Sequence, residues 1–334
     1  MTTPQWARFG RIRNHPQASA WLEFQANLGL ADNTLDAYGR GLEAFLAFCE
    51  VRSFPTNLAK REHIALYVRH LADSGLANAT LQQRLTAVRL FFDHLVEDGI
   101  RTENPVGRGR YRPGNAFGGT RERGLIARYH KLPWIPSEAQ WQAILVAARQ
   151  ECLRNRTMFA FAYDAGLRRE ELCLLSTQDI DPPHRLLRVR AETTKNRQER
   201  RVPYSTCAGK LYQAYVHERA KVSHSRGALF LSESARNRGQ PISIWTWTKV
   251  VERIAKRAQI PEFTTHTLRH LCLTDLARAD WDLHEIAQFA GHRSLQSTLC
   301  YIHLSGRELA EKLARSLESI RDMRLTEMEA WVNE

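Results

Sequence analysis

The stretch GHRSLQSTLCYIH, residues 291–303, places a histidine directly after a glycine and a tyrosine nine residues further on. Taken alone, Tyr301 has the ordinary interpretation of a tyrosine, an aromatic side chain that packs in a core. His292 has an ordinary interpretation too, as a residue that caps the end of a helix. Whether Tyr301 is a structural aromatic or a nucleophile therefore depends on what the rest of the chain supplies.

Several other polar residues stand where secondary-structure propensity alone would not put them. Arg168 follows a Gly-Leu turn in DAGLRREE, and an isolated interpretation makes it part of surface ion pairs. Lys195 lies at a polar tip, TTKNRQER, where a solvated turn is the simplest explanation. HTLRH places His266 and Arg269 on one face of a helix, and His266 and His270 four residues apart. No H-E-x-x-H glutamate or paired downstream ligand accompanies the histidines, so a metal site is not expected.

As a set, these stretches resemble the tyrosine recombinase (phage integrase) family. HTLRH followed by GHRSLQSTLCYIH is similar to its signature, H-x-L-R-H, then L-G-H, then Y-x-H. DAGLRREEL resembles the family's first arginine motif, T-G-L-R-x-x-E-L, and TTKNRQERRVP resembles its β-hairpin lysine motif. Four motifs in the family's order make the resemblance specific, and it extends from Ala18 to about Met323.

The resemblance implies a role for each matching residue. The six catalytic residues would be Arg168, Lys195, His266, Arg269, His292 and Tyr301. The two arginines would clamp the scissile phosphate, Lys195 would be the general acid for the leaving oxygen, and the histidines would hydrogen-bond the phosphate or assist proton transfer. Tyr301 would be the nucleophile. Glu171 and Asp179 would lie behind the first arginine and orient it.

The chemistry of phosphodiester cleavage suits these residue types. Guanidinium groups present paired donors to phosphate oxygens and stay charged at any working pH. Such electrostatic stabilisation can replace a metal ion. A phenol with a pKa near 10 needs positive surroundings to attack as phenolate, and two arginines with two histidines are expected to supply them. A covalent 3′-phosphotyrosine conserves bond energy, so neither metal, ATP nor another cofactor is expected.

Two departures from the family pattern are small. Ala290 stands where a leucine usually precedes the glycine, which is expected to alter packing only. Asp280 replaces a glycine at a helix end, and aspartate tolerates the left-handed backbone conformation better than most residues.

Hydrophobic periodicity predicts a mainly α fold. In residues 17–100, apolar side chains recur at helical spacing in four segments joined by short connections. The resemblance makes this a SAM-like core-DNA-binding domain. From residue 134 the helical pattern returns, is interrupted by a β-hairpin in RLLRVRAETTKNRQERRVPY, and then continues. This half is expected to be a mixed α/β, integrase-like catalytic domain with a small antiparallel sheet.

The chain is expected to have five parts. Residues 1–16 would be a basic extension, 17–100 the helical domain, 101–133 a Gly/Arg-rich linker, 134–323 the catalytic domain and 324–334 an interaction segment. Residues 1–100 hold ten basic and ten acidic residues, whereas residues 101–133 hold eight and two. The linker is therefore interpreted as a strap along a DNA backbone, with a passive tether as the alternative. Its candidate DNA-binding residues are Arg108, Arg110, Arg112, Arg121 and Arg123.

The whole chain has 334 residues and a net charge of +12, which favours a polyanionic partner. Its six cysteines form no C-x-x-C pair, and no stretch suits a signal peptide or a membrane span. We therefore expect a cytoplasmic protein, in a bacterial cell or encoded by a phage or mobile element, without a membrane partner. The resemblance implies double-stranded DNA recombination sites as partners, a homotetramer on paired sites, and accessory DNA-bending or partner recombinase proteins.

Three functions remain open at this point. The first is a site-specific recombinase that works through a 3′-phosphotyrosine and a Holliday junction. It would serve integration, excision or transposition of a mobile element, as a phage-type integrase or a transposase, or would act as a Xer-like resolvase. The second is a type IB topoisomerase, which shares the phosphotyrosine chemistry but relaxes any supercoiled plasmid. The third is a DNA-binding protein without catalysis, which the complete set of six residues argues against.

Overall fold

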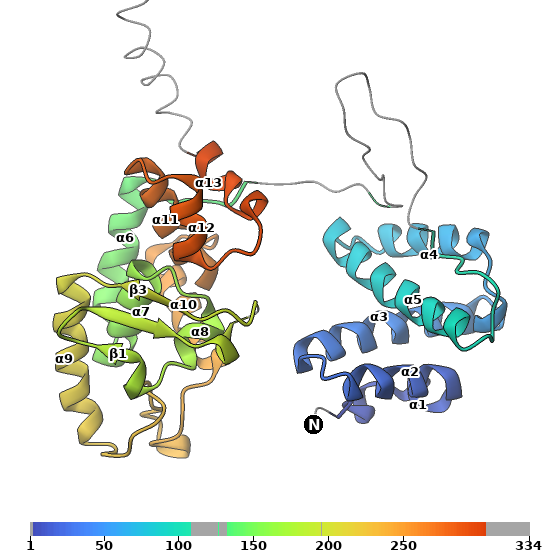
Figure 1. The fold of residues 1–334 in the computed structure, drawn as a ribbon, viewed down its shortest axis with the longest axis horizontal. Helices are drawn as coiled ribbons and strands as arrows, with labels where there is room; N and C mark the ends of the chain where they lie inside the picture. The colour runs from blue at the N-terminus through green and yellow to red at the C-terminus, as the bar shows by residue number, and fades with distance from the viewer. Residues whose placement is uncertain (1–2, 108–125, 127–131, 195, 305–334) are drawn as a thin grey trace, which may run out of the picture. The chain divides into compact units, whose positions relative to one another are not determined.

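The computed structural model describes residues 3–107, 126, 132–194 and 196–304. The chain divides into two compact units, Met1–His130 and Lys131–Glu334, and each is described here by itself (Figure 1). The first is helical throughout its described residues, and the second combines helices with one small sheet. The expected mainly α fold with a small antiparallel sheet is confirmed.

The first unit is a helical bundle around an aromatic core. The four expected helices are present, and the core contains Trp21, Phe45, Phe91 and Phe92. Gly41 lets two of these helices approach closely, because a Cβ there would lie 2.9 Å from the Cβ of Ala87. Its helices are α1 (Gly10–Asn14), α2 (Pro16–Asn27), α3 (Asp32–Val51), α4 (Arg61–Asp73) and α5 (Asn78–Glu97), with short 3-10 turns η1 (Trp6–Arg8) and η2 (Thr56–Leu58).

Part of the expected N-terminal extension, residues 1–16, contributes to the core of this unit. Phe9 and Ile12 are fully buried in its core, and the ring of Phe9 occupies space that any side chain at Gly39 would fill. The carboxylate of Glu43 accepts hydrogen bonds from the backbone N–H groups of Arg11 and Ile12, which fixes the start of α1. A five-residue helix carries too little periodicity to be recognised from sequence.

The beginning of the expected linker also packs on the first unit. Arg101 donates hydrogen bonds to the backbone carbonyls of Asn57 and Ala59, and its guanidinium lies 5.0 Å from the ring centroid of Phe92. Val106 is buried in the same core. The five candidate DNA-binding arginines, Arg108, Arg110, Arg112, Arg121 and Arg123, lie outside the described residues, as does the segment 324–334.

The second unit is built from helices that follow the expected order. Ser137 caps α6 by accepting a hydrogen bond from the backbone N–H of Gln140. Asp280 adopts a φ of +60° after α11, the left-handed conformation expected there. The helices are α6 (Glu138–Arg149), α7 (Leu153–Asp164), α8 (Arg169–Cys173), α9 (Thr206–Ala220), α10 (Ile244–Ala258), α11 (Thr265–Arg278), α12 (Leu283–Ala290) and α13 (Leu299–Leu304), with 3-10 turns η3 (Thr177–Asp179), η4 (Ala191–Thr193), η5 (Ala235–Asn237) and η6 (Leu295–Ser297).

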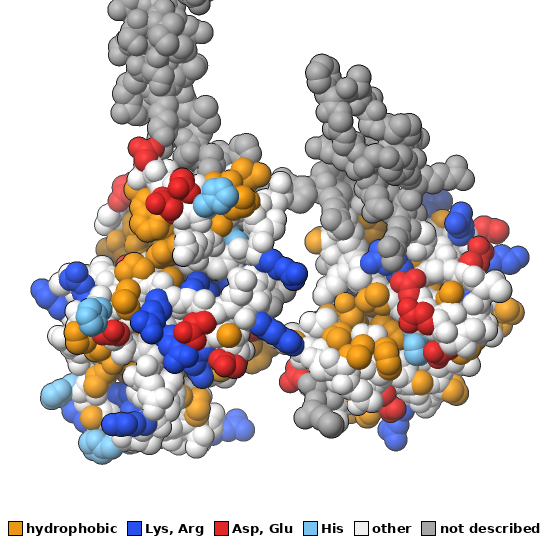
Figure 2. Space-filling view, in the orientation of Figure 1, with side chains coloured by type: hydrophobic (Ala, Val, Ile, Leu, Met, Phe, Trp, Pro, Cys, Tyr) orange, Lys and Arg blue, Asp and Glu red, His pale blue; other side chains and the backbone are white. Residues whose placement is uncertain are grey.

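The sheet of the second unit contains the expected hairpin and one further strand. β2 (Leu186–Val189) pairs antiparallel with β3 (Arg200–Pro203), and Val189 lies opposite Arg200. β1 (Ile180–Asp181) pairs with the other edge of β2 and is too short to have been predicted from sequence. Figure 2 shows basic side chains mixed with acidic ones over the region of the sheet and α8.

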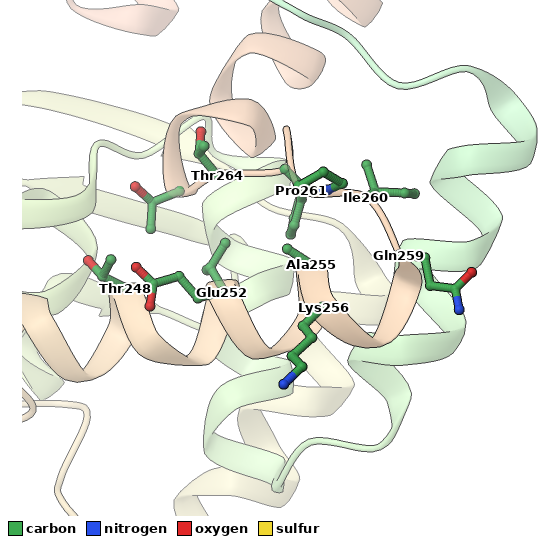
Figure 3. Close-up of a pocket in the computed structure, with 11 residues that line it drawn as sticks. Thr248, Glu252, Ala255, Lys256, Gln259, Ile260, Pro261 and Thr264 are labelled. Carbon is green, nitrogen blue, oxygen red and sulfur yellow. The ribbon is translucent and has the colours of Figure 1, made fainter.

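No helix in the described ranges is long and apolar enough to cross a membrane. A hollow of about 520 Å³ lies between α10 and the connection to α11. Figure 3 shows Thr248, Glu252 and Ala255 on α10 facing this region, and Pro261 and Thr264 on the connection. None of the predicted catalytic residues lines this hollow, so it is not the candidate site.

Candidate active site

Arg168 is positioned by the turn that begins α8. Gly166 has a φ of +54°, and a Cβ there would lie 3.3 Å from the ring of Phe289, so the turn requires glycine. Arg168 Nη1 donates to Glu171 Oε1 at 2.8 Å, and the Arg168 backbone N–H donates to the other carboxylate oxygen at 2.9 Å. Nη2 donates to the carbonyl of Gly291 at 3.1 Å, which joins α8 to the end of α12.

Arg269 lies on α11 and is 4% exposed. Its guanidinium donates to the carbonyls of Gly166 and Ala290 and to His292 Nε2, the last at 3.0 Å. Burial and the nearby charge of Arg168 lower the pKa of this guanidinium to about 10, so it remains cationic at neutral pH. The predicted pair of arginines therefore converges on one turn, Ala290 to His292.

Arg200 on β3 completes this cluster, and sequence analysis missed it. Its Nη2 and Nη1 donate to the two Glu171 oxygens at 2.7 and 3.1 Å, and its Nε donates to the carbonyl of Phe289 at 3.0 Å. The Arg200 side chain is 8% exposed and that of Glu171 only 1%. Arg200 stands in the hairpin motif RRVP, where alternation identified the strand but gave no sign of a buried partner.

The cluster has an excess of positive charge. Arg168 and Arg200 share the single carboxylate of Glu171, whereas the hydrogen bonds of Arg269 go to neutral acceptors. Burial alone would raise the pKa of Glu171, but hydrogen bonds from Arg200 and the charges of Arg200 and Arg168 lower it to about 2. Because three cations surround a single anion, the cluster is not neutralised and can bind a further anion such as a phosphodiester.

His292 is held as a neutral imidazole. Its Nε2 accepts from Arg269, so its hydrogen is on Nδ1, which donates to Thr298 Oγ1 at 2.8 Å. Burial, followed by the charges of Arg269, Arg168 and Arg200, lowers the pKa of His292 to about 4. The pKa of His266 is also lowered, chiefly by burial. With their pKa values lowered, these two imidazoles add little positive charge at neutral pH, and the guanidinium groups supply most of the positive field.

Tyr301 lies on α13 beside this cluster and is 3% exposed. Its ring is parallel to that of His292, with centroids 6.2 Å apart, and its hydroxyl is 2.9 Å from His270 Nδ1. Burial is the main reason that the pKa of Tyr301 is raised to about 12. These contacts are within one chain, so in this structure the tyrosine lies in the site that its own chain forms.

Thr298 contacts both His292 and Tyr301. Its side chain is fully buried, its hydroxyl bonds His292, and its carbonyl accepts the Tyr301 backbone N–H at 3.0 Å. The segment between His292 and Tyr301 is thus anchored at its centre. Neither Thr298 nor His270 was among the predicted site residues. His270 stands in the HTLRH motif but was given no role, and Thr298 lies between η6 and α13, where no motif marks it.

Of two other expected residues, Asp179 has a different partner and Lys195 lies outside the described residues. Asp179 does not contact Arg168 but accepts from Arg190 Nε at 3.1 Å and from the backbone N–H of Ser176 at 2.8 Å. It lies on η3, and its ion pair with Arg190 joins η3 to the end of β2. Lys195 lies outside the described residues, although its neighbour Asn196 donates a hydrogen bond from Nδ2 to the Gly291 carbonyl at 3.0 Å.

A cavity of about 640 Å³ opens on the cluster. It is lined in part by Arg200, Trp281, Phe289, Gly291 and His292. Within the described ranges no group of three or more His, Cys, Asp or Glu side chains is arranged to hold a metal ion. The guanidinium groups can bind an anion, and the ring of Tyr301 lies against His292 at the edge of the cluster.

Comparisons with known proteins agree with this geometry. The family model described as "Phage integrase family" matches residues 137–308, and "Phage integrase, N-terminal SAM-like domain" matches residues 20–99. The tyrosine recombinase XerC of Corynebacterium glutamicum is 32% identical over 245 residues, 72% of each chain. The tyrosine recombinase XerD of Halalkalibacterium halodurans is 26% identical over 299 residues, 85% of this chain and 92% of the relative.

A solved structure shares the fold. The Tn1549 transposon integrase in complex with transposon right end DNA matches with a TM-score of 0.65 and 18% identity, over 88% of this chain and 98% of that one. The resemblance drawn from the four motifs is confirmed. The chain belongs to the phage integrase family and is a tyrosine recombinase, an enzyme that cleaves and rejoins DNA strands at specific sites.

Proposed function

We propose that this enzyme cleaves DNA through a 3′-phosphotyrosine formed on Tyr301 and exchanges strands through a Holliday junction. The observation that carries the proposal is the position of Tyr301 against a cluster of three guanidinium groups that share one carboxylate. Arg168 and Arg269 would hold the non-bridging oxygens of the scissile phosphate, and their charge would stabilise the transition state. Glu171 keeps the first arginine in place.

Proton transfer to the leaving 5′-oxygen is assigned to Lys195, on the argument from the hairpin motif. The hydrogen bond from Asn196 to the Gly291 carbonyl supports this assignment, because it brings the hairpin tip to the turn that the arginines hold. His292 is proposed to hydrogen-bond the phosphate as a neutral group, and His266 to act nearby. A lysine at a tip can deliver a proton where a metal would otherwise be needed.

The DNA partner is proposed to be a double-stranded recombination site, with two sites held by a homotetramer and with accessory proteins in some reactions. The transposon integrase supports a mobile-element role in integration, excision or transposition. The similarity to XerC and XerD recombinases supports a Xer-like resolvase as the alternative role. The segment 324–334 is proposed to dock on a neighbouring subunit. The arginines of the linker 101–133 are proposed to contact the DNA backbone, namely Arg108, Arg110, Arg112, Arg121 and Arg123.

The test is a selection from random sequences, which does not require the DNA site to be known in advance. A pool of random-sequence duplexes, each with a nick near its centre, is incubated with the protein, and DNA in SDS-resistant 3′-linked adducts is recovered and sequenced. We expect one enriched site with the wild-type protein and none with Tyr301→Phe. Adduct formation by Tyr301→Phe would refute the assignment of Tyr301 as the nucleophile.

A second arm distinguishes the topoisomerase. Recombination requires a pair of the recovered sites, whereas a type IB topoisomerase relaxes supercoiled plasmids that lack them. We therefore expect relaxation of a plasmid only when it carries the selected site. Efficient relaxation of a plasmid without the site would favour the topoisomerase.

A further inference from the structure

The hydroxyl of Tyr301 has a partner that the family resemblance did not assign. His270 follows Arg269 directly on α11, and its Nδ1 is 2.9 Å from Tyr301 Oη. Building on the proposed function, we propose that His270 is a catalytic residue that accepts the proton of the Tyr301 hydroxyl during strand cleavage. The assignment concerns the nucleophile's proton, which neither the arginines nor Lys195 removes in the mechanism above.

The geometry favours a proton on the tyrosine oxygen and a free lone pair on the histidine nitrogen. Phenol is a stronger acid than the N–H of a neutral imidazole, and an imidazole nitrogen is a stronger base than a phenol oxygen. The hydrogen bond therefore runs from Tyr301 Oη to His270 Nδ1. The two rings are tilted by 37° with centroids 5.7 Å apart.

The groups around His270 keep it neutral. It is faced by Arg269 and His266 from its own helix, by His292 from the turn after α12, and by Tyr301 from α13. Burial, then the charges of His266 and Arg269, lowers the pKa of His270 to about 4. A neutral imidazole is the form that can accept a proton, and a bound phosphodiester would offset the positive field that weakens it as a base.

His266, which the resemblance offered for proton transfer, is not the residue that meets the hydroxyl. Its ring centroid lies 6.3 Å from that of His270, on the preceding turn of α11. The tyrosine hydroxyl instead bonds His270, one turn further along. The structure thus separates the two histidines of HTLRH, and only the second contacts the reacting oxygen.

The proposed step balances without an added reagent. As Oη bonds phosphorus, its proton moves to His270 Nδ1, the P–O5′ bond breaks, and the 5′-oxygen takes a proton from the general acid. On rejoining, the 5′-oxygen bonds phosphorus and returns its proton to the general acid, the P–Oη bond breaks, and the imidazolium protonates Oη. With pKa values of about 12 for Tyr301 and about 4 for His270, the hydroxyl keeps its proton until bonding to phosphorus makes it acidic.

The test measures single-turnover cleavage of the duplex recovered by the selection, using the full-length protein. His270→Ala is expected to slow cleavage at least about 100-fold, the usual contribution of a general base. His270→Gln keeps the volume and an acceptor oxygen but cannot take up a proton, so it is expected to be similarly slow. His284→Ala removes an exposed histidine of α12 and is expected to cleave at the wild-type rate. Thermal denaturation and DNA binding report whether each variant is folded.

A substrate with a bridging 5′-sulfur separates the two proton transfers. A thiolate leaves without a general acid, so this substrate restores cleavage to a variant that lacks the acid but not to one that lacks the base. We expect the His270 variants to stay slow on it. Restoration by the sulfur, full activity of His270→Gln, or faster cleavage by His270→Ala would each overturn the proposal.

The result is separable from the proposed function. If the wild-type protein forms no adduct, or Tyr301→Phe still forms one, the nucleophile assignment fails before His270 is tested. If Tyr301 forms the adduct and His270→Ala forms it as fast as wild type, only the role of His270 fails.

Discussion

Arg200 offers the sharpest test of how this site is held together. It connects β3 to α8 through Glu171 and to the end of α12 through the Phe289 carbonyl, with three hydrogen bonds from one guanidinium. Replacing it with alanine leaves Glu171, 1% exposed, with Arg168 as its remaining cation. Removing one partner of a buried ion pair lowers the stability of the fold, because the other charge stays buried without its partner.

The magnitude follows from the pKa of Glu171. Its shift from an ordinary 4.5 to about 2 corresponds to about 3 kcal/mol of stability at neutral pH, at about 1.4 kcal/mol per pH unit. Loss of one partner of a buried pair costs roughly 3–5 kcal/mol in other proteins, which agrees. For a unit of this size, about 3 kcal/mol lowers the midpoint of thermal unfolding by roughly 6–12 °C.

The depressed pKa of Glu171 also predicts how the stability difference between wild type and Arg200→Ala changes with pH. A carboxylate whose folded pKa is depressed stabilises the fold above its unfolded pKa, and this contribution is lost as the pH falls through the folded value. The wild-type protein should therefore lose the Glu171 contribution between about pH 4.5 and pH 2. The Arg200→Ala variant keeps only the part of this contribution that Arg168 supplies, so the two stabilities should converge as the pH falls.

The assay is thermal and denaturant unfolding of wild type and Arg200→Ala between pH 7 and pH 3. The control is Arg188→Ala on β2, whose ion pair with Glu199 is exposed on both sides, and no measurable change is expected. Arg200→Lys keeps the charge but not the paired donors and should lie between wild type and alanine. A difference at pH 7 no larger than that of the control, or one that does not shrink at low pH, would refute the reasoning.

Three further predictions test other parts of the structure. Gly291→Ala should destabilise the second unit by about 1–2 kcal/mol in denaturant unfolding, because φ there is +63° and the new Cβ would meet a buried guanidinium at 3.0 Å. Thr298→Val should slow single-turnover cleavage roughly tenfold by leaving His292 Nδ1–H without its acceptor, whereas Thr298→Ser should not. Phe9→Ala should destabilise the first unit by about 3–5 kcal/mol in thermal unfolding, and a loss near zero would mean that the N-terminal segment is dispensable.

One more prediction concerns the basic segment. Replacing Arg108, Arg110, Arg112, Arg121 and Arg123 together with glutamine should reduce the salt dependence of DNA binding. If all five contact phosphates, the slope of log affinity against log salt should fall by roughly 4 to 5. Affinity measured across a salt series checks it, and an unchanged slope would favour the passive tether.

What the sequence determined by itself was the kind of fold and the residues that recur in fixed motifs. Helical periodicity located the helices of both units, and alternation located the hairpin, because both are local properties of the chain. Four motifs with family-like spacing identified Arg168, Arg269, His292 and Tyr301 as one site, and the structure brings these four together.

Only the tertiary structure decided what surrounds those residues. Arg200, Thr298 and His270 meet their partners across 29, 6 and 31 residues, and no local pattern encodes such pairs. The pKa of a histidine also depends on its surroundings, since burial beside arginines lowers the pKa of His292 to about 4. Residue type sets which proton a group can carry, but the surrounding dielectric and charges set whether it carries it at neutral pH.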